Sequence, residues 1–197
     1  MKLILNTPIT EEEIRKLKIG DIFYVSGEMI TARDEAHKKA LESISKGIKI
    51  PVSFEGKALY HCGPVVKRTD GKWQVIAAGP TTSTRLEMFE AEFIRNFGVR
   101  VIIGKGGMGD MTAEACKKYG CVYAAFTGGA ALIAASAIKR VKRVEWLDLG
   151  MPEALWVFEV KDFGPLVVAI DTNGENLFKG VISNSRKNLE EVLKEYE

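Results

Sequence analysis

Two glycine-containing segments carry side chains that could bind a small anion. Residues 79–85 read Gly-Pro-Thr-Thr-Ser-Thr-Arg, so a rigid turn delivers four consecutive hydroxyls and then Arg85 to the start of an expected helix. Residues 103–107 read Ile-Gly-Lys-Gly-Gly, which delivers Lys105 from the end of an expected strand. Helix N-termini and loops at strand ends are common anion-binding positions. Cations and hydroxyls converging there indicate a small, acidic, oxygen-rich substrate.

Each segment also has a plainer interpretation. An ordinary helix cap needs one hydroxyl, and the run from Thr81 to Thr84 exceeds that need. A glycine-rich loop can simply be flexible, but four glycines around Lys105 indicate special backbone angles or close approach to a ligand. The P-loop pattern is excluded, because residues 104–106 have neither its spacing nor the hydroxyl that follows its Lys.

A third candidate group lies at residues 31–38, which read Thr-Ala-Arg-Asp-Glu-Ala-His-Lys. Arg33 and His37 are four residues apart, which places them on one face of a helix start. One interpretation is a surface Arg beside Asp34 as the helix cap. The functional interpretation makes Arg33 a bidentate carboxylate clamp, with His37 as an orienting or proton-transfer group.

Composition narrows the class of protein. The chain has 197 residues, 46% of them apolar, which supports a substantial core. Its 28 basic and 26 acidic residues give a formal net charge of +2, which argues against a nucleic-acid-binding surface. The basic residues at 139–143 are expected on a solvated helix end. Residues 1–6 become polar too soon for a signal peptide, and no apolar run is long enough to span a membrane.

The cysteines fit a cytoplasmic protein with reduced thiols. Cys62, Cys116 and Cys121 are odd in number and form no CxxC motif. A buried position in the core is the expected role for free thiols of this kind. His61, beside Cys62, is expected to pack or bond locally at a strand end.

Local patterns predict short elements in the first half of the chain. Thr10 and Glu13 form a capping box that begins a helix reaching about Lys18. The other elements expected there are two strands within 19–30 joined by a turn at 26–27, a helix over 31–47, strands at 59–62 and 73–78 with a hairpin turn at 70–71, and a helix after a second capping box at 84–87.

Strands and helices alternate in the second half, which predicts a parallel sheet. The expected elements are a strand at 99–103, a helix at 111–119, a strand at 121–126, a helix at 130–141, strands at 153–160 and 166–171, and a charged helix at 185–196. No linker or repeat interrupts the chain, so we expect one α/β domain over residues 1–197.

Over most of its length, roughly residues 3–178, the chain resembles the β subunit of class I iron–sulfur hydro-lyases. These are the oxygen-sensitive fumarases and the related L(+)-tartrate dehydratases. The segments that carry the resemblance are 7–9 (Thr-Pro-Ile), 20–21 (Gly-Asp), 32–34 (Ala-Arg-Asp), 36–38 (Ala-His-Lys), 63–64 (Gly-Pro), 79–85, 104–108 (Gly-Lys-Gly-Gly-Met), 128–130 (Gly-Gly-Ala), 149–156 (Leu-Gly-Met-Pro-Glu-Ala-Leu-Trp) and 162–165 (Asp-Phe-Gly-Pro).

The resemblance implies a swivelling β/β/α domain, with a mixed sheet flanked by helices, equivalent to the C-terminal domain of single-chain class I fumarases. It also implies an α subunit as partner, which holds a 4Fe-4S cluster on three cysteines of its own, so none of the cysteines here is assigned as a ligand. The implied reaction is reversible trans-addition of water to fumarate, giving (S)-malate. Nucleic-acid and membrane partners are not expected, and a homodimer is left open for the isolated chain.

Residue by residue, the family motif assigns Arg33, Arg85 and Lys105 to the dicarboxylate substrate. It assigns Thr81 as the proposed base, with His37 in the same motif in a less defined role. L(+)-tartrate dehydration to oxaloacetate is the alternative within the family. A non-catalytic assembly subunit and a stand-alone anion- or nucleotide-binding protein are the alternatives outside it.

Overall fold

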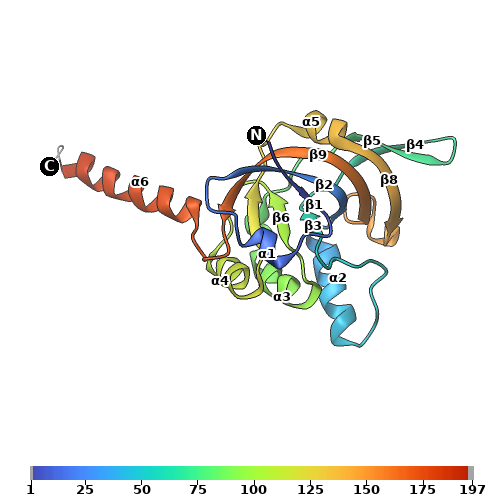
Figure 1. Cartoon of the computed structure of the whole chain (residues 1–197), viewed down its shortest axis with the longest axis horizontal. Helices are drawn as coiled ribbons and strands as arrows, with labels where there is room; N and C mark the ends of the chain where they lie inside the picture. The colour runs from blue at the N-terminus through green and yellow to red at the C-terminus, as the bar shows by residue number, and fades with distance from the viewer. Residues whose placement is uncertain (1, 195–197) are drawn as a thin grey trace.

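A barrel-like sheet forms the centre of the molecule (Figure 1). The computed structural model describes residues 2–194. The strand order is β1-β2-β3-β6-β7-β9-β8, and β2 also pairs with β9, which closes β2, β3, β6, β7 and β9 into a ring. The strands are β1 (Leu3–Asn6), β2 (Ile22–Thr31), β3 (Ala58–Tyr60), β6 (Val101–Gly104), β7 (Val122–Ala125), β8 (Ile138–Glu145) and β9 (Leu155–Ile170), with β4 (Val65–Thr69) and β5 (Lys72–Ala77) as a separate hairpin.

The directions of the strands determine which loops lie at the same edge of the sheet. Neighbouring strands β2, β3, β6 and β7 run parallel, so their carboxyl ends meet at one edge of the sheet. Strand β9 runs antiparallel to both β7 and β2. The expected α/β class, with a mixed sheet flanked by helices, is confirmed. Ligands of such sheets bind outside the carboxyl ends of the strands.

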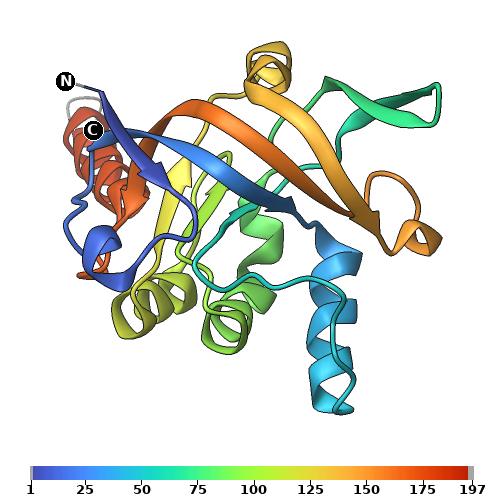
Figure 2. The same ribbon diagram turned by 45° about the vertical axis from the view of Figure 1, so that its right-hand side comes forward.

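Side chains of the parallel strands alternate between two apolar cores. In β6, Val101 and Ile103 face the barrel interior, and Ile102 faces the helices. Helices α2, α3 and α4 cover that outer face (Figure 2). The helices are α1 (Glu11–Ile14), α2 (Asp34–Ser45), α3 (Glu87–Phe97), α4 (Asp110–Tyr119), α5 (Ala131–Ala137) and α6 (Leu177–Lys194), with 3-10 turns η1 (Ser83–Leu86) and η2 (Leu147–Leu149).

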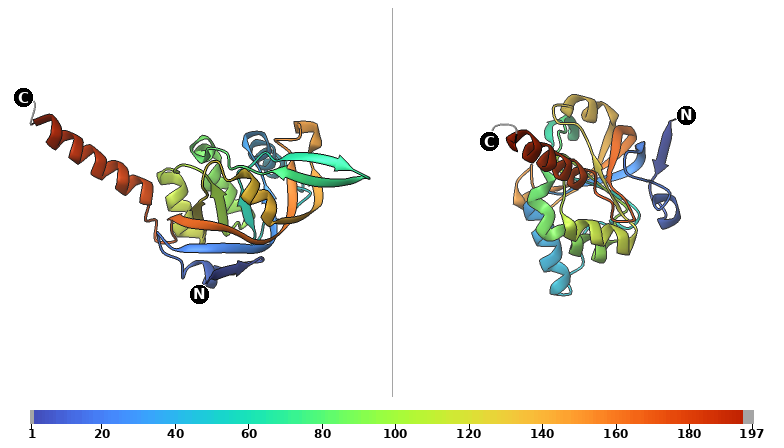
Figure 3. Two further views of the ribbon diagram at one scale, coloured as in Figure 1. Left: turned by 90° about the horizontal axis from the view of Figure 1, so that it is seen from above. Right: turned by 90° about the vertical axis from the view of Figure 1, so that its left-hand side faces the viewer.

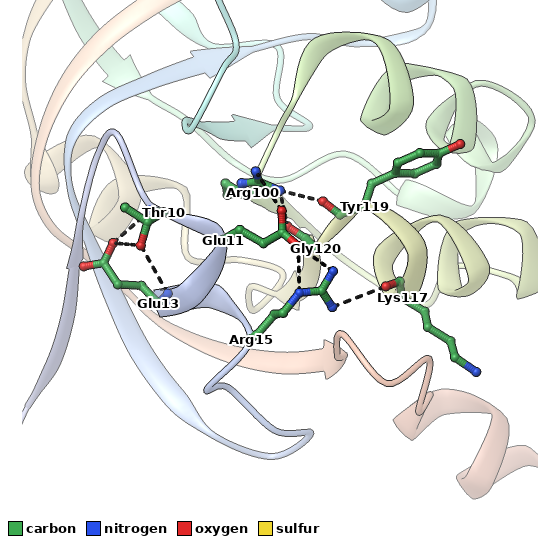
Figure 4. Close-up of polar contacts among 8 residues, drawn as sticks. All are labelled: Thr10, Glu11, Glu13, Arg15, Arg100, Lys117, Tyr119 and Gly120. Atoms are coloured by element: carbon green, nitrogen blue, oxygen red, sulfur yellow. Dashed lines mark hydrogen bonds and ion pairs between the residues drawn. The ribbon is translucent and has the colours of Figure 1, made fainter.

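The segment between β1 and β2 is fixed by a cap and an ion pair (Figure 4). The N–H of Glu13 donates to Thr10 Oγ1 at 3.2 Å and the N–H of Thr10 donates to the Glu13 carboxylate at 2.8 Å, which confirms the capping box. Helix α1 ends at Ile14, earlier than expected. Glu11 meets Arg100 at 3.5 Å, and that guanidinium also donates to two carbonyls at the end of α4. These contacts tie α1 to α4.

Helix α6 leaves the body of the molecule and extends away from it (Figures 1 and 3). It begins at Leu177, earlier than the helix expected at 185–196, and residues 195–196 lie outside the described residues. Several of its apolar side chains are exposed, namely Leu177, Val181, Ile182, Leu189, Val192 and Leu193. Among residues 2–194, none of the helices has both the length and the apolarity needed to cross a membrane.

Two strand predictions were wrong in their boundaries. Residues 22–31 form one strand, and the expected turn at 26–27 is a register shift at Gly27, whose φ is +104°. Residues 155–170 likewise form one strand, β9, where two were expected. In both cases pairing with a neighbouring strand carries the backbone past a local turn signal, since β2 and β9 pair with each other along most of their length.

The expected helix at 130–141 was also wrong beyond residue 137. Residues 138–141 belong to strand β8, and the basic residues at 139–143 lie on that edge strand instead of on a helix end. Ile138, Val141 and Val144 pack against the barrel core at a spacing of three, because register shifts interrupt the strand. Apolar residues three positions apart are also typical of one face of an amphipathic helix. The turn at 70–71 is present, but it joins β4 to β5 and not β3 to β5.

Candidate active site

The hydroxyl segment and the lysine loop lie against each other at the sheet edge. The N–H of Thr81 donates to the carbonyl of His61 just beyond β3, at 2.6 Å. The N–H of Lys105, just beyond β6, donates to the Thr81 carbonyl at 3.3 Å, and the N–H of Ser83 donates to the Lys105 carbonyl at 3.0 Å. The structure therefore places Thr81 and Lys105 side by side at the carboxyl ends of two parallel strands.

The glycine loop after β6 is held on both sides. The Tyr123 hydroxyl donates to the Gly106 carbonyl and the Thr84 hydroxyl donates to the Gly107 carbonyl, each at 2.8 Å. Gly106 has a φ of +73°, which favours glycine. At Gly104 a Cβ would collide with the Ser83 side chain, so glycine there permits the two segments to approach. Lys105 itself is exposed.

The capping box expected at 84–87 does not form. Thr84 uses its hydroxyl on the glycine loop instead. The Glu87 carboxylate accepts from the N–H groups of Gly109 and Thr112, at 2.6 and 3.1 Å, and from the Thr112 hydroxyl at 2.7 Å. Glu87 thus caps α4, the helix that follows the loop of Lys105. A cap formed across the fold leaves no signal in local spacing.

Arg33 stands where β2 passes into α2, at the same edge of the sheet. Its Nε lies 3.2 Å from Glu153 Oε1, and its side chain is 23% exposed. The other oxygen of Glu153 accepts from the N–H of Glu35 at 3.1 Å, so one carboxylate orients both the guanidinium and the first turn of α2. A Cβ at Gly63 would lie 2.7 Å from the Pro152 carbonyl oxygen and 2.9 Å from an Arg33 terminal nitrogen, so glycine makes room for both.

Arg85, on η1, reaches the start of α2. Its guanidinium donates to Asp34 Oδ1 at 3.0 Å, and 56% of the side chain is exposed. Asp34 was interpreted as a helix cap, but no side-chain cap bond is present at the start of α2. Instead, Asp34 connects Arg85 to the residue next to Arg33. The structure thus brings the three predicted cations to one edge, on the loops after β2 and β6 and on η1.

His37 and His61 lie behind this edge, fully buried. His37 Nδ1 is 2.8 Å from the Arg33 carbonyl, and His61 Nδ1 is 3.0 Å from Ser83 Oγ. Both Nε2 atoms face Glu90 Oε2, at 3.5 Å for His37 and 3.0 Å for His61. His61 therefore contacts side chains on η1 and α3, and not only groups near the end of its own strand.

Sequence reasoning missed Glu90 and gave no role to Glu153. A signal for Glu90 existed, since it shares the apolar helical face of Leu86 and Phe93, and a carboxylate at such a position needs a buried partner. Burial lowers the pKa of the His61 imidazole, so that ring is neutral. Burial alone would raise the pKa of the Glu90 carboxyl, but attraction by His61 and His37 outweighs it and holds the pKa at about 2.

The cysteines do not converge on one space. All three are buried free thiols, with Cys62 in the barrel interior and Cys116 and Cys121 between the sheet and the helices. Burial raises the pKa of Cys62 and of Cys121, which disfavours the thiolate that binds iron. These residues do not fit an iron–sulfur cluster.

A cavity of about 680 Å³ lies elsewhere, between β1, β2, β8 and β9. Glu28 lines it together with Lys57 and Lys142. Hydrogen bonds from Lys142 and Lys57 hold the pKa of Glu28 at about 2. Glu28 pairs with Lys57 and Lys142 there, and Lys139 and Lys161 also line the cavity.

Comparison with known proteins gives relatives over almost the whole chain. A family model described as "Fumarase C-terminus" matches residues 1–181. The L(+)-tartrate dehydratase subunit beta of Escherichia coli (strain K12) is 45% identical over 179 residues, covering 90% of this chain and 87% of that protein.

Two further relatives differ in length. The putative L(+)-tartrate dehydratase subunit beta of Methanocaldococcus jannaschii is 41% identical, covering 94% of this chain and 95% of that protein. A putative fumarate hydratase class I of Geobacillus stearothermophilus is 43% identical and covers 95% of this chain, but this chain spans 35% of that longer protein.

Proposed function

The chain belongs to the Fumarase C-terminus family, and from that premise we propose that it is the β subunit of an iron–sulfur hydro-lyase that hydrates fumarate to (S)-malate. The supporting observation is the convergence of Arg33, Arg85 and Lys105 with Thr81 at the carboxyl edge of the parallel strands. Three cations facing one edge suit a substrate with two carboxylates.

Each residue then has a role in the reaction. Arg33 offers its terminal nitrogens to one carboxylate, because its Nε lies buried in an ion-pair contact with Glu153. Arg85 and Lys105 are exposed and can reach the other. Thr81 takes the proton from the carbon that loses it during dehydration and returns it during hydration. A Thr hydroxyl is a weak base, and the neighbouring cations stabilise its deprotonated form.

His37 is assigned to positioning and not to proton transfer with the substrate. Its ring has no exposed surface, and both of its nitrogens face protein atoms. A group that exchanges protons with a substrate must come within hydrogen-bonding distance of it.

The cluster belongs to the partner in this proposal, because the three cysteines here do not fit it. When bound, such a cluster supplies a Lewis-acidic iron. This chain contributes the carboxylate-binding cations and the hydroxyl. The α subunit is the expected partner, in keeping with the subunit names of the relatives.

L(+)-tartrate is the second candidate substrate, favoured by the names of the two shorter relatives. Tartrate and malate are both four-carbon 2-hydroxy dicarboxylates, so the same cations would serve either. The test is to co-purify this chain with a class I α subunit anaerobically and to measure kcat/KM for fumarate, (S)-malate and L(+)-tartrate. A higher value for fumarate and malate supports the proposal, a higher value for tartrate selects the second candidate, and conversion of none of them refutes both.

An assembly role without catalysis is tested in the same complex. Arg85→Ala should reduce turnover while leaving the α–β complex intact, because the exposed Arg85 side chain is paired with Asp34 inside this chain. Loss of assembly with normal activity per assembled complex would instead indicate a scaffold.

A further inference from the structure

Two histidines and one glutamate form a closed polar cluster behind the sheet edge. His37 comes from α2, Glu90 from α3 and His61 from the end of β3, and the two helices lie together beneath the sheet (Figure 2). All three side chains are fully buried. The sequence contains two histidines in all, and both are here. Without contact with bulk water, their polar atoms must be satisfied by one another and by nearby protein groups.

Hydrogen-bond chemistry fixes where the protons lie. The Arg33 carbonyl only accepts, so His37 Nδ1 at 2.8 Å must carry a hydrogen. Both His37 Nε2 and His61 Nε2 face Glu90 Oε2, at 3.5 and 3.0 Å, as ion-pair contacts without regular hydrogen-bond geometry. When the Ser83 hydroxyl donates to His61 Nδ1, the His61 ring is neutral and carries its hydrogen at Nε2. A second hydrogen on His37, at the Nε2 that lies 3.5 Å from Glu90, would make that ring an imidazolium.

The charges are consistent with that arrangement. Contacts with the two rings, through charge and hydrogen bonding together, lower the pKa of Glu90 to about 2, so its carboxylate is ionised, and burial lowers the pKa of His61. An ionised Glu90 and an imidazolium at His37 neutralise each other, which a fully buried pair requires. Phe93 and Phe89 pack against the His37 ring, so the pair is enclosed by apolar surface.

We propose that His37, Glu90 and His61 form a buried, proton-carrying unit that positions the substrate-binding residues at the sheet edge. Its positioning role rests on the function proposed above. The unit ends on the Arg33 carbonyl at one side and on the Ser83 hydroxyl at the other. Ser83 in turn bonds the Lys105 carbonyl through its own N–H. One internal ion pair thereby joins the segment of Arg33 to the segment of Lys105, although neither ring touches the substrate.

A divalent cation is the rival occupant of the same cluster, since the three ligand atoms lie within 4.8 Å of one another. A structural tetrahedral site needs four ligands, and this group supplies three. A three-ligand site leaves a position for water or substrate, whereas these side chains are sealed inside the protein. In the proton-carrying arrangement these groups interact through their charges, because neither Nε2 atom nor either Glu90 oxygen makes a hydrogen bond of regular geometry.

The direct test uses the full chain labelled with 15N-histidine, because the two histidines give a spectrum that reports this unit alone. At pH 7.5 the expected spectrum shows one imidazolium and one neutral ring protonated at Nε2. In Glu90→Gln the uncharged amide cannot neutralise a buried imidazolium, so both rings become neutral. The matched control is Glu92→Gln on the exposed face of the same helix, which should leave the spectrum unchanged.

Three spectroscopic or analytical results would overturn the proposal. They are two neutral rings in the wild-type chain, an imidazolium that persists in Glu90→Gln, and a stoichiometric bound metal found by elemental analysis. The wild-type spectrum is a test by itself, so the proposal can be refuted even if Glu90→Gln fails to fold.

Kinetics of the α–β complex test the positioning role. Replacing the charge-assisted bond with a neutral one should raise KM about tenfold and leave kcat within about threefold, because the unit orients carboxylate-binding residues and not the reacting atoms. Unchanged KM in Glu90→Gln, with an active wild-type complex, would refute positioning. An inactive wild-type complex with the expected histidine spectrum would instead count against the proposed reaction, so the two failures are distinguishable.

Discussion

Replacing Arg33 with Ala should weaken substrate binding without unfolding the protein. The guanidinium is 23% exposed and is oriented by Glu153 through its Nε. That leaves its terminal nitrogens as the part able to meet a carboxylate. In Arg33→Ala the ion pair between Arg33 and Glu153 is lost. Glu153 would still accept the hydrogen bond from the Glu35 N–H, which holds the first turn of α2.

The size of the effect follows from the bond that is lost. Removing one charged hydrogen-bonding partner costs about 2–3 kcal/mol. Since each 1.36 kcal/mol is tenfold, kcat/KM should fall roughly thirty- to 150-fold, mainly through KM. Arg33→Lys should lose about tenfold, because an ammonium is a single point charge and cannot serve Glu153 and the substrate with one planar fork.

Steady-state kinetics of the α–β complex with fumarate and L(+)-tartrate provide the assay. Arg143→Ala is the matched control, because Arg143 is about half exposed on β8 and meets Glu145 at 3.8 Å on the surface. It should leave kcat/KM unchanged. If Arg33→Ala is within about twofold of the wild type while the control behaves as expected, Arg33 does not bind the substrate.

Four further outcomes are expected. Thr81→Val in the complex should lower kcat by about 10²–10⁴ with little change in KM, and solvent-deuterium exchange into malate should fall in parallel. Native thiols should react slowly with a thiol reagent and fully after unfolding in urea, because burial raises the pKa of Cys62 and Cys121. Glu87→Ala should lower the free energy of unfolding by about 2 kcal/mol in urea titrations, because three hydrogen bonds at the start of α4 are lost. Because Lys142 and Lys57 lower the folded pKa of Glu28 from 4.5 to about 2, its contribution to stability is lost as the pH falls through that range, and Glu28→Gln should flatten this part of the pH–stability curve.

Much of the sheet was predictable because its signals are local. Strands β6 and β7 are short apolar runs between glycine turns and amphipathic helices, which is the pattern of a parallel sheet. The capping box at Thr10 also depends on side chains three residues apart. The sequence also predicted that the side chains of segments 79–85 and 103–107 would converge, although 79–85 follows β5 of the separate hairpin and 103–107 follows β6 of the main sheet.

The remaining errors arise where distant strands decide the structure. Strand β8 has apolar residues at 138, 141 and 144, a spacing that a helix also shows, and pairing with β9 determines the outcome. Strand β9 runs through Gly164 and Pro165 because β2 provides partners on both sides of them. Closure of the barrel by β2 and β9 has no counterpart in local sequence.

Residues of the candidate site divide in the same way. Arg33, Arg85, Lys105 and Thr81 belong to segments whose composition is unusual in itself. The segment around Glu90 has no unusual composition, and the partners of Glu90 come from α2 and from the end of β3. A buried carboxylate on an apolar helix face is detectable, but which bases meet it depends on how the helices pack.

The two arginines of the site differ in how firmly the chain already holds them. Arg85 is 56% exposed and paired with Asp34, and an exposed pair of this kind contributes about 0–1 kcal/mol. A substrate carboxylate can therefore recruit Arg85 at little cost. Arg33 and Glu153 are 23% and 18% exposed, and Glu153 is itself fixed by α2, so Arg33 enters the encounter already oriented. The fixed Arg33 therefore sets the position of the substrate carboxylate, and the mobile Arg85 closes onto the substrate afterwards.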